Sequence, residues 1–434
     1  MMNHQSIQRI FVECGDTSAC RLNTGIQRVV RNIVRYGQRV ARGTHFSPVV
    51  WGPDGFTRCS ADALRTPIAA PPPAAPPRGL RRLQQKVKKR LVKMLYPRTI
   101  GRAVSAQWAK VTDQQVQFRA GDLILMPDAT WNQPHWDSLQ VAKRQGAQVG
   151  VLIHDLIPLS YPQFFQPELV ERFDEWARTM LHYVDFFMTV SRVVRDDVRR
   201  FVHRANPSSR TIPVEAITNG CDLDAAGPVQ PVREEVRRLF GDQRNHAPFI
   251  MVGTMEPRKN HAVCLDAFEM IWRRSRSSRF LIAGRVGWKS QELTERIQKH
   301  PLYGHNLFHF QDLNDSEIEF AYRRARASVF PSFVEGFGLP IVESLQFGCP
   351  VIASDTPIHR EVGTSFCSYF NPLCPRELAD QIELLEAGGT LSGVQPPEAY
   401  VPHTWLQAAG ELLEKSAHVA SRLRATHGLS TRAA

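Results

Sequence analysis

The sequence predicts an α/β protein with two domains, each built on a mainly parallel sheet. Short apolar runs alternate with segments of helical periodicity along most of the chain, as in repeated βαβ units. The chain has 434 residues, which is more than one hydrophobic core usually organises. A mixed-charge stretch separates two such patterns. We therefore expect a first domain over residues 1–223, a linker over 224–247, a second domain over 248–385 and a helical segment over 386–434.

Composition and charge narrow the classes of partner. Hydrophobic residues make up 43% of the chain, which is typical of a globular protein. The net charge of +12 favours an acidic partner, such as a phosphorylated small molecule, a nucleic acid or an anionic membrane. The cysteines form no CxxC pair, so we expect reduced thiols in a cytoplasm and no zinc site. We expect neither a signal peptide nor a membrane span, because no run approaches 18 apolar residues.

The first domain is expected to place polar residues at the carboxyl ends of its strands. The expected strands are Arg9–Cys14, Gly121–Met126, Gln148–Ile153, Phe186–Val190 and Val214–Thr218. The expected helices are Ile26–Tyr36, Glu168–Val184 and Arg192–Phe201, the last capped by Ser191. Thr24 and Gly25 precede the first helix, where a glycine lets a ligand approach the backbone. His154 directly follows a strand, at the position where doubly wound sheets bind ligands.

Residues 60–118 interrupt this pattern. Six prolines fall within residues 67–77, which excludes a helix or a central strand there. Residues 78–95 then carry basic residues around an apolar stripe, with no acidic residue. This pattern is typical of an amphipathic helix on an anionic membrane surface, although a solvated helix packed on the domain fits equally well. RNA binding is less favoured because no aromatic residues interleave with the charges.

The second domain is expected to begin with the strand Phe249–Gly253. Arg258 and Lys259 follow it in a loop, where two cations can neutralise a diphosphate; a solvated turn is the alternative. The remaining expected elements before the next motif are the helix His261–Trp272 and the strands Phe280–Ala283, Asn306–Phe310 and Ala327–Phe330. A last helix is expected at Trp405–Arg424, packing across both domains.

The segment Val329–Ser354 reads as one βαβ unit. Glu335 lies in its glycine-rich loop, and Glu343 lies one turn into a helix that Pro340 begins. Loop glycines admit a ligand to the backbone amides, and a helix N-terminus favours an anion. The segment is therefore predicted to hold a molecule that is phosphorylated and rich in hydroxyl groups. Together with Arg258, Lys259 and His154, the two carboxylates suit group transfer from a nucleotide diphosphate without a metal.

The chain resembles the family 4 retaining glycosyltransferases of the GT-B fold. The resemblance is carried by Val252–Phe268 and Pro331–Asp355, in which Glu335 and Glu343 match the family motif E-x7-E. Shorter matches in the first domain are TGIQRVVRNI, IHDLIP and ITNGCD. The resemblance implies two Rossmann-like, doubly wound domains that face each other across a cleft, with hinges near residues 222–247 and 385–405.

The resemblance also implies a role for each matching residue. Arg258 and Lys259 would hold the diphosphate of the donor. Glu335, with the backbone amides of Gly336, Phe337 and Gly338, would bind the donor sugar. Glu343 would bind the ribose.

On the acceptor side, the resemblance places His154 near the reacting carbon and Thr24 and Gly25 beside the phosphate and the acceptor. The leaving phosphate oxygen would take the acceptor's proton, so no nucleophilic side chain and no metal is needed. Two departures stand out: Thr254 replaces an arginine frequent in relatives, and Gly25 stands where many have two glycines.

IHDLIP together with GTMEPRKN is similar to mannosyl- and rhamnosyltransferases of bacterial polysaccharide assembly. We therefore expect a glycan or lipid-linked glycan acceptor and GDP-mannose as the first donor to test, at the inner face of a membrane reached through residues 78–95. A nucleotide-sugar epimerase on the same fold is one alternative. A non-catalytic membrane-surface or nucleic-acid-binding protein is another. A dehydrogenase is disfavoured, because Ile341 stands where the GxGxxG motif needs its third glycine.

Overall fold

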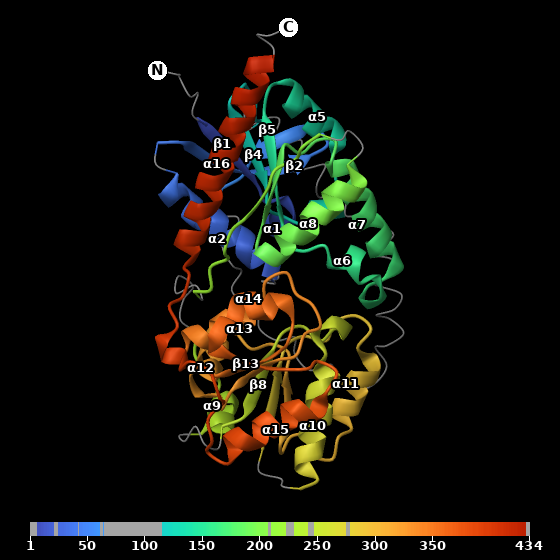
Figure 1. The fold of residues 1–434 in the computed structure, drawn as a ribbon, viewed down its shortest axis with the longest axis vertical. Coiled ribbons are helices and arrows are strands. Elements are labelled where there is room, and N and C mark those ends of the chain that lie inside the picture. Colours follow the sequence, from blue (N-terminus) through green and yellow to red (C-terminus); the bar gives the residue numbers. More distant parts are fainter. Residues whose placement is uncertain are drawn as a thin grey trace, which may run out of the picture.

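The computed structural model consists of two α/β halves, one above the other along the long axis of the molecule (Figure 1). Each half is a sheet with helices on both faces. The structure describes residues 7–20, 25–41, 43–60, 64, 115–206, 210–222, 230–241, 247–274 and 278–430. Residues 78–95, where the basic amphipathic helix is expected, lie outside this set, as does Thr24.

The first half contains a seven-stranded sheet in the order β3-β2-β1-β4-β5-β6-β7. Its strands are β1 (Arg9–Glu13), β2 (His45–Gly52), β3 (Gly55–Arg58), β4 (Asp122–Met126), β5 (Gln148–Ile153), β6 (Phe186–Thr189) and β7 (Val214–Ala216). All neighbours are parallel except the β2–β3 hairpin. Strand β4 is buried at every position, because helices cover both faces of a parallel sheet.

The helices of the first half include α8, which Ser191 caps as predicted. The Ser191 hydroxyl accepts a hydrogen bond of 3.2 Å from the amide of Val194. The elements are α1 (Gly15–Ala19), α2 (Gly25–Val40), η2 (Thr130–Asn132), α5 (Trp136–Arg144), α6 (Ile157–Ser160), η3 (Pro162–Phe164), α7 (Pro167–Met180) and α8 (Arg192–Ala205).

The second half contains a six-stranded parallel sheet in the order β10-β9-β8-β11-β12-β13. Its strands are β8 (Phe249–Val252), β9 (Phe280–Ala283), β10 (Leu307–Phe310), β11 (Ser328–Phe330), β12 (Val351–Ser354) and β13 (Cys367–Phe370). Its helices are α9 (Glu234–Phe240), η5 (Pro257–Lys259), α10 (His261–Trp272), α11 (Gln291–Gln298), α12 (Asp315–Arg324), α13 (Leu339–Gln346), α14 (Pro357–Gly363), η6 (Thr364–Phe366) and α15 (Pro375–Glu386). The strand order reverses between β8 and β11, which opens a crevice at their carboxyl ends.

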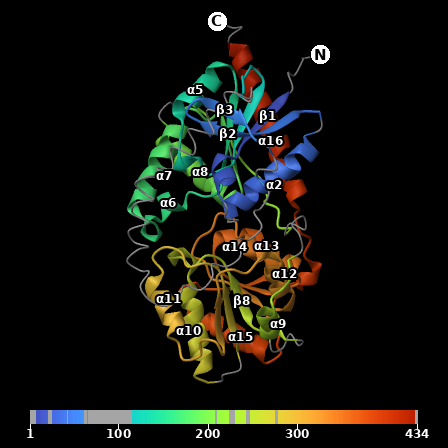
Figure 2. The ribbon, with the colours of Figure 1, turned by 180° about the vertical axis from the view of Figure 1, so that it is seen from behind.

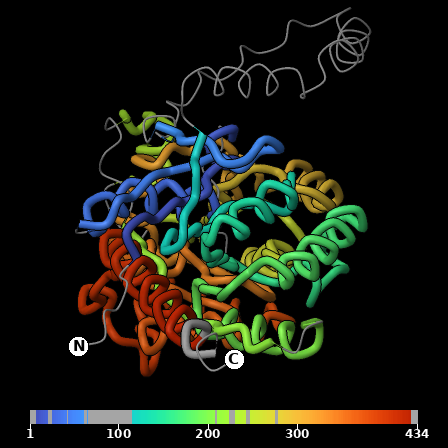
Figure 3. The backbone as a smooth tube through the Cα atoms, turned by 90° about the horizontal axis from the view of Figure 1, so that it is seen from above, coloured from blue at the N-terminus to red at the C-terminus, as the bar shows by residue number. Residues whose placement is uncertain are grey.

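The chain returns to the first half through η7 (Pro397–Ala399) and α16 (Trp405–Ser430). Helix α16 packs against α2, and the two lie side by side in the views from behind and from above (Figure 2, Figure 3). The start of α16 packs closely against the first half. A Cβ atom on Gly220 would lie 2.4 Å from the amide nitrogen of Trp405, and this amide donates a hydrogen bond of 2.6 Å to Asp222. Among the described residues, no helix is both long and apolar enough to cross a bilayer.

Candidate active site

The crevice between β8 and β11 brings together three of the predicted residues. Arg258 and Lys259 lie in η5, directly after β8, and Glu335 lies in the loop after β11. Arg258 Nη1 lies 2.6 Å from Glu335 Oε2, and Lys259 Nζ lies 2.5 Å from Glu335 Oε1. Each carboxylate oxygen therefore receives one cation, and the two loops are joined at the carboxyl edge of the sheet.

The electrostatics keep Glu335 ionised although the residue is only 8% exposed. Burial would raise the pKa of Glu335, but the charges of Arg258 and Lys259 outweigh it and bring the pKa to about 2. Burial lowers the pKa of Lys259 in spite of its carboxylate partner. The site thus offers a fixed anion, which is a strong acceptor for hydroxyl groups, beside two cations.

Two further carboxylates, those of Glu256 and Asp155, lie near Arg258, and the sequence pattern did not predict that either of them would interact with it. Glu256 Oε1 lies 2.7 Å from Arg258 Nη2, and Glu256 is 4% exposed. Burial raises the pKa of Asp155, and the nearby charge of Arg258 opposes that rise. The available signal was local: Glu256 comes two positions before Arg258, and Asp155 follows His154 at the end of β5.

His154 lies at the carboxyl end of β5, as predicted, and its ring is fixed by the backbone. Its Nε2 atom lies 2.7 Å from the carbonyl oxygen of Pro127. Because a carbonyl oxygen can only accept, Nε2 carries the proton and Nδ1 is left as an acceptor in the neutral ring. Burial lowers the pKa of His154, which favours that neutral form.

Gly336 lets the two halves approach each other at His154. A Cβ atom on Gly336 would lie 2.0 Å from the carbonyl oxygen of His154, so no other residue fits there without a shift. Glycine is required at position 338 for a different reason. Gly338 precedes α13 with a φ of +100°, which lies in the left-handed region. Phe337, between them, is 8% exposed. The loop that carries Glu335 is therefore shaped by the opposing half as well as by its own.

Glu343 lies on α13 and has a partner that was not predicted. Arg28 Nη1 lies 2.5 Å from Glu343 Oε1, although Arg28 belongs to α2 in the first half. Gly25 begins α2, and no described atom lies within 4 Å of the place where a Cβ atom would project. The cleft therefore brings Glu343 together with the helix that follows the Thr24–Gly25 loop.

Comparison with protein families defines the class of the second half. Residues 232–391 match the family model described as glycosyl transferases group 1, so this part of the chain is a glycosyltransferase group 1 domain. The overall fold is that of GT-B glycosyltransferases. Sucrose-phosphate synthase from Thermosynechococcus elongatus is 16% identical, with a TM-score of 0.54 over 98% of this chain and 100% of that one. Anabaena HepE, solved with UDP and glucose, is 14% identical, with a TM-score of 0.52 over the same shares.

Several curated relatives of the chain are mannosyltransferases. The serotype-specific mannosyltransferase WbdA of Escherichia coli is 32% identical over 279 residues, which cover 62% of this chain and 34% of WbdA. The O-antigen chain mannosyltransferase RfbU of Salmonella typhimurium is 27% identical over 223 residues, which cover 51% of this chain and 56% of RfbU. The matched region thus spans about a third of the length of WbdA.

Proposed function

We propose that the chain is a retaining glycosyltransferase. It moves a mannosyl unit, or a related unit such as rhamnosyl, from a nucleotide-diphosphate sugar to a glycan or lipid-linked glycan acceptor in cell-surface polysaccharide assembly. The observation that carries the proposal is the ionised Glu335 held between Arg258 and Lys259 at the crevice of a glycosyltransferase group 1 domain. The mannosyltransferase relatives support mannose as the sugar.

The cations are suited to hold the diphosphate, which is also the leaving group. As the bond from the sugar carbon to the phosphate oxygen breaks, negative charge develops on that oxygen. Arg258 and Lys259, whose side chains are largely buried, would stabilise this charge. The acceptor oxygen bonds to the sugar carbon on the same face, and its proton passes to the departing phosphate oxygen.

Glu335 and His154 are suited to position the sugar. The carboxylate of Glu335 would accept hydrogen bonds from sugar hydroxyl groups, and the amides of Gly336, Phe337 and Gly338 would support it. His154 would use its Nδ1 atom as an acceptor, because its Nε2 proton is committed to Pro127. In this role His154 orients the substrate and takes no proton from the acceptor.

The test is a transfer assay with a panel of nucleotide sugars and a mannose-containing acceptor. We expect GDP-mannose to be consumed only when the acceptor is present, and nuclear magnetic resonance to show the donor's anomeric configuration in the product. Isomerisation of the donor without an acceptor would indicate an epimerase instead. A product of inverted configuration would contradict the retaining mechanism.

Access to lipid-linked acceptors is the role we propose for residues 78–95, at the inner face of the membrane. The test is sedimentation with anionic and with zwitterionic vesicles, for the full chain and for a variant that lacks residues 78–95. We expect the full chain to bind anionic vesicles but not zwitterionic ones, and the variant to bind neither. Equal retention of both proteins would contradict this role.

A further inference from the structure

The guanidinium of Arg28 enters the second half of the molecule. Arg28 lies in the first turn of α2 and pairs at 2.5 Å with Glu343 on α13. Its side chain is 18% exposed and that of Glu343 only 2%. Burial would lower the pKa of Arg28, but the charges of Glu343 and Asp315 outweigh it and the pKa is raised. Arg28 is therefore a cation held by the acidic groups of the opposing half.

This contact is separate from the cluster that we assign to the diphosphate. Arg258 and Lys259 pair with Glu335, and Arg258 also pairs with Glu256. Arg28 instead pairs with Glu343 and lies in the field of Asp315, which begins α12. The cleft thus has two charge clusters, and Arg28 belongs to the one at Glu343.

The low exposure of Glu343 determines whether the ribose of a ligand could contact its carboxylate. With Arg28 in place, a carboxylate that is 2% exposed offers no surface to the hydroxyl groups of a ribose. The Glu343 oxygen that Arg28 contacts at 2.5 Å becomes available to a ligand only after the guanidinium has moved.

We propose that Arg28 closes the nucleoside subsite before the donor binds and competes with the donor's ribose for Glu343. This inference rests on the proposed function, in which Glu343 binds that ribose. The donor then enters when the halves separate at α2, and its ribose takes the place of the guanidinium. Arg28 is a specificity-determining residue in this sense: a ligand without a ribose gains nothing from displacing it.

The competition predicts a gain of affinity when the guanidinium is removed. In calorimetry, Arg28→Gln is expected to bind GDP and UDP about 3- to 10-fold more tightly than the unchanged protein, the range for loss of one partly buried ion pair. Pyrophosphate, which lacks the nucleoside, is expected to bind both proteins equally. Arg178→Gln, which removes an exposed arginine from α7, serves as the matched control and should change neither affinity.

Unchanged or weaker binding of both nucleoside diphosphates to Arg28→Gln would overturn the inference. So would an equal gain for pyrophosphate, since that would indicate a general opening of the cleft. Arg28→Lys retains the cation, so its affinity for GDP and UDP is expected to stay close to that of the unchanged protein. A gain of affinity as large as that of Arg28→Gln would also contradict competition. If no protein in the series binds any nucleoside diphosphate, the proposed function itself fails.

Discussion

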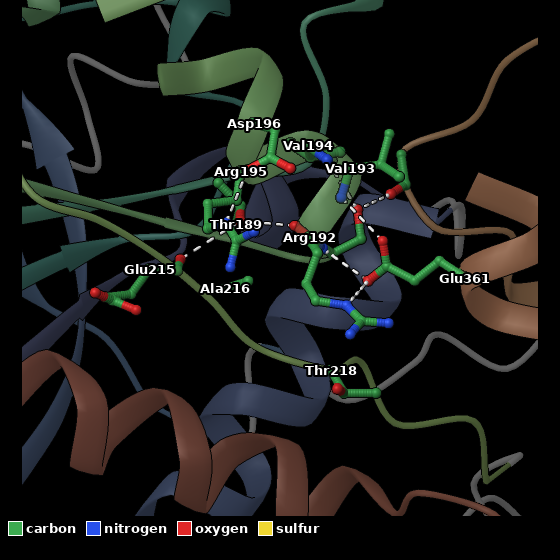
Figure 4. Close-up of polar contacts among 12 residues, drawn as sticks. Thr189, Arg192, Val193, Val194, Arg195, Asp196, Glu215, Ala216, Thr218 and Glu361 are labelled. Atoms are coloured by element: carbon green, nitrogen blue, oxygen red, sulfur yellow. Dashed lines mark hydrogen bonds and ion pairs between the residues drawn. The ribbon is translucent and has the colours of Figure 1, made fainter. Parts of the chain in front are cut away.

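The hydroxyl group of Ser191 donates a hydrogen bond of 2.8 Å to the carbonyl oxygen of Gly336, across the boundary between the two halves. Beside it, the carboxylate of Glu361 accepts hydrogen bonds from the amides of Arg192 at 2.7 Å and Val193 at 2.9 Å (Figure 4). The N-terminus of α8 therefore holds an anion from α14, as the helix dipole favours. We call these five residues the cleft latch.

Loosening the cleft latch should slow transfer and leave nucleotide binding intact. Glu361→Gln removes the charge that α8 holds, so kcat/KM is expected to fall about 3- to 10-fold, in line with a helix-terminus interaction. The affinity for GDP should not change, because Glu361 lies outside the donor contacts that we propose. Steady-state kinetics and calorimetry check this. Glu383→Gln, at the exposed pair with Arg274, is the control and should match the unchanged protein.

Closing the halves should require glycine at position 336. In Gly336→Ala the new Cβ atom would meet the carbonyl oxygen of His154 at 2.0 Å, so the halves could not reach the closed arrangement. Transfer is expected to fall by about 100-fold, as for other small displacements of a reacting group, while the melting temperature stays near its original value. Gly410→Ala has room for its methyl group and is the control. Full activity in Gly336→Ala would show that transfer does not need this contact.

The contribution of Asp128 to stability should fall as the pH rises from about 4 to 6. Burial raises the pKa of Asp128, which is 2% exposed, from 3.8 to about 6. The folded protein therefore keeps this proton up to a higher pH than the unfolded chain does. The stabilising contribution of the Asp128 proton is fully present below the pKa of Asp128 in the unfolded chain. It is lost as the pH rises through the pKa of Asp128 in the folded protein. The two pKa values differ by an amount that corresponds to about 3 kcal/mol.

Denaturant unfolding of Asp128→Asn at several pH values checks this. Between about pH 4 and 6, the slope of the free energy of unfolding against pH should be more positive in Asp128→Asn than in the unchanged protein. In Asp128→Asn, the hydrogen bonds that residue 128 accepts from Thr17 will weaken at every pH. The comparison therefore uses the slope of the free energy of unfolding against pH and not its absolute value. Parallel curves for the two proteins would contradict the assignment.

Transfer should not depend on a divalent metal, because Arg258 and Lys259 supply the positive charge beside the leaving diphosphate. We expect the rate in excess EDTA to stay within about twofold of the rate in Mg²⁺, a change too small to reflect loss of a catalytic cation. A rate that collapses in EDTA and returns with Mg²⁺ or Mn²⁺ would refute metal independence.

Much of the sheet framework could be predicted because buried parallel strands are short, apolar and bounded by turns. The bounds expected for β5 and β9 match the structure. The hairpin of β2 and β3 was missed, because Pro48 interrupts the apolar pattern of β2 and a proline argues against a strand. Helix α7 ends at Met180, earlier than expected, because apolar residues continue through the turn that follows it.

The proximity of Arg258, Lys259 and Glu335 could be predicted, because all three follow strands of one sheet. The contacts that cross the cleft could not be predicted. Arg28 and Glu361 lie on helices with ordinary surface patterns, and nothing local in the sequence says which residue of the other half they meet. Such contacts depend on how the two sheets face each other, which a periodic pattern does not encode.

The most direct test of the central claim is the transfer rate of Glu335→Gln with saturating nucleotide sugar. The variant keeps the shape of the side chain and loses the charge that Arg258 and Lys259 hold. We predict that kcat falls about 100-fold or more, the usual effect of losing one preorganised charged group, with circular dichroism unchanged. A Glu335→Gln protein that transfers sugar at the original rate would contradict the account.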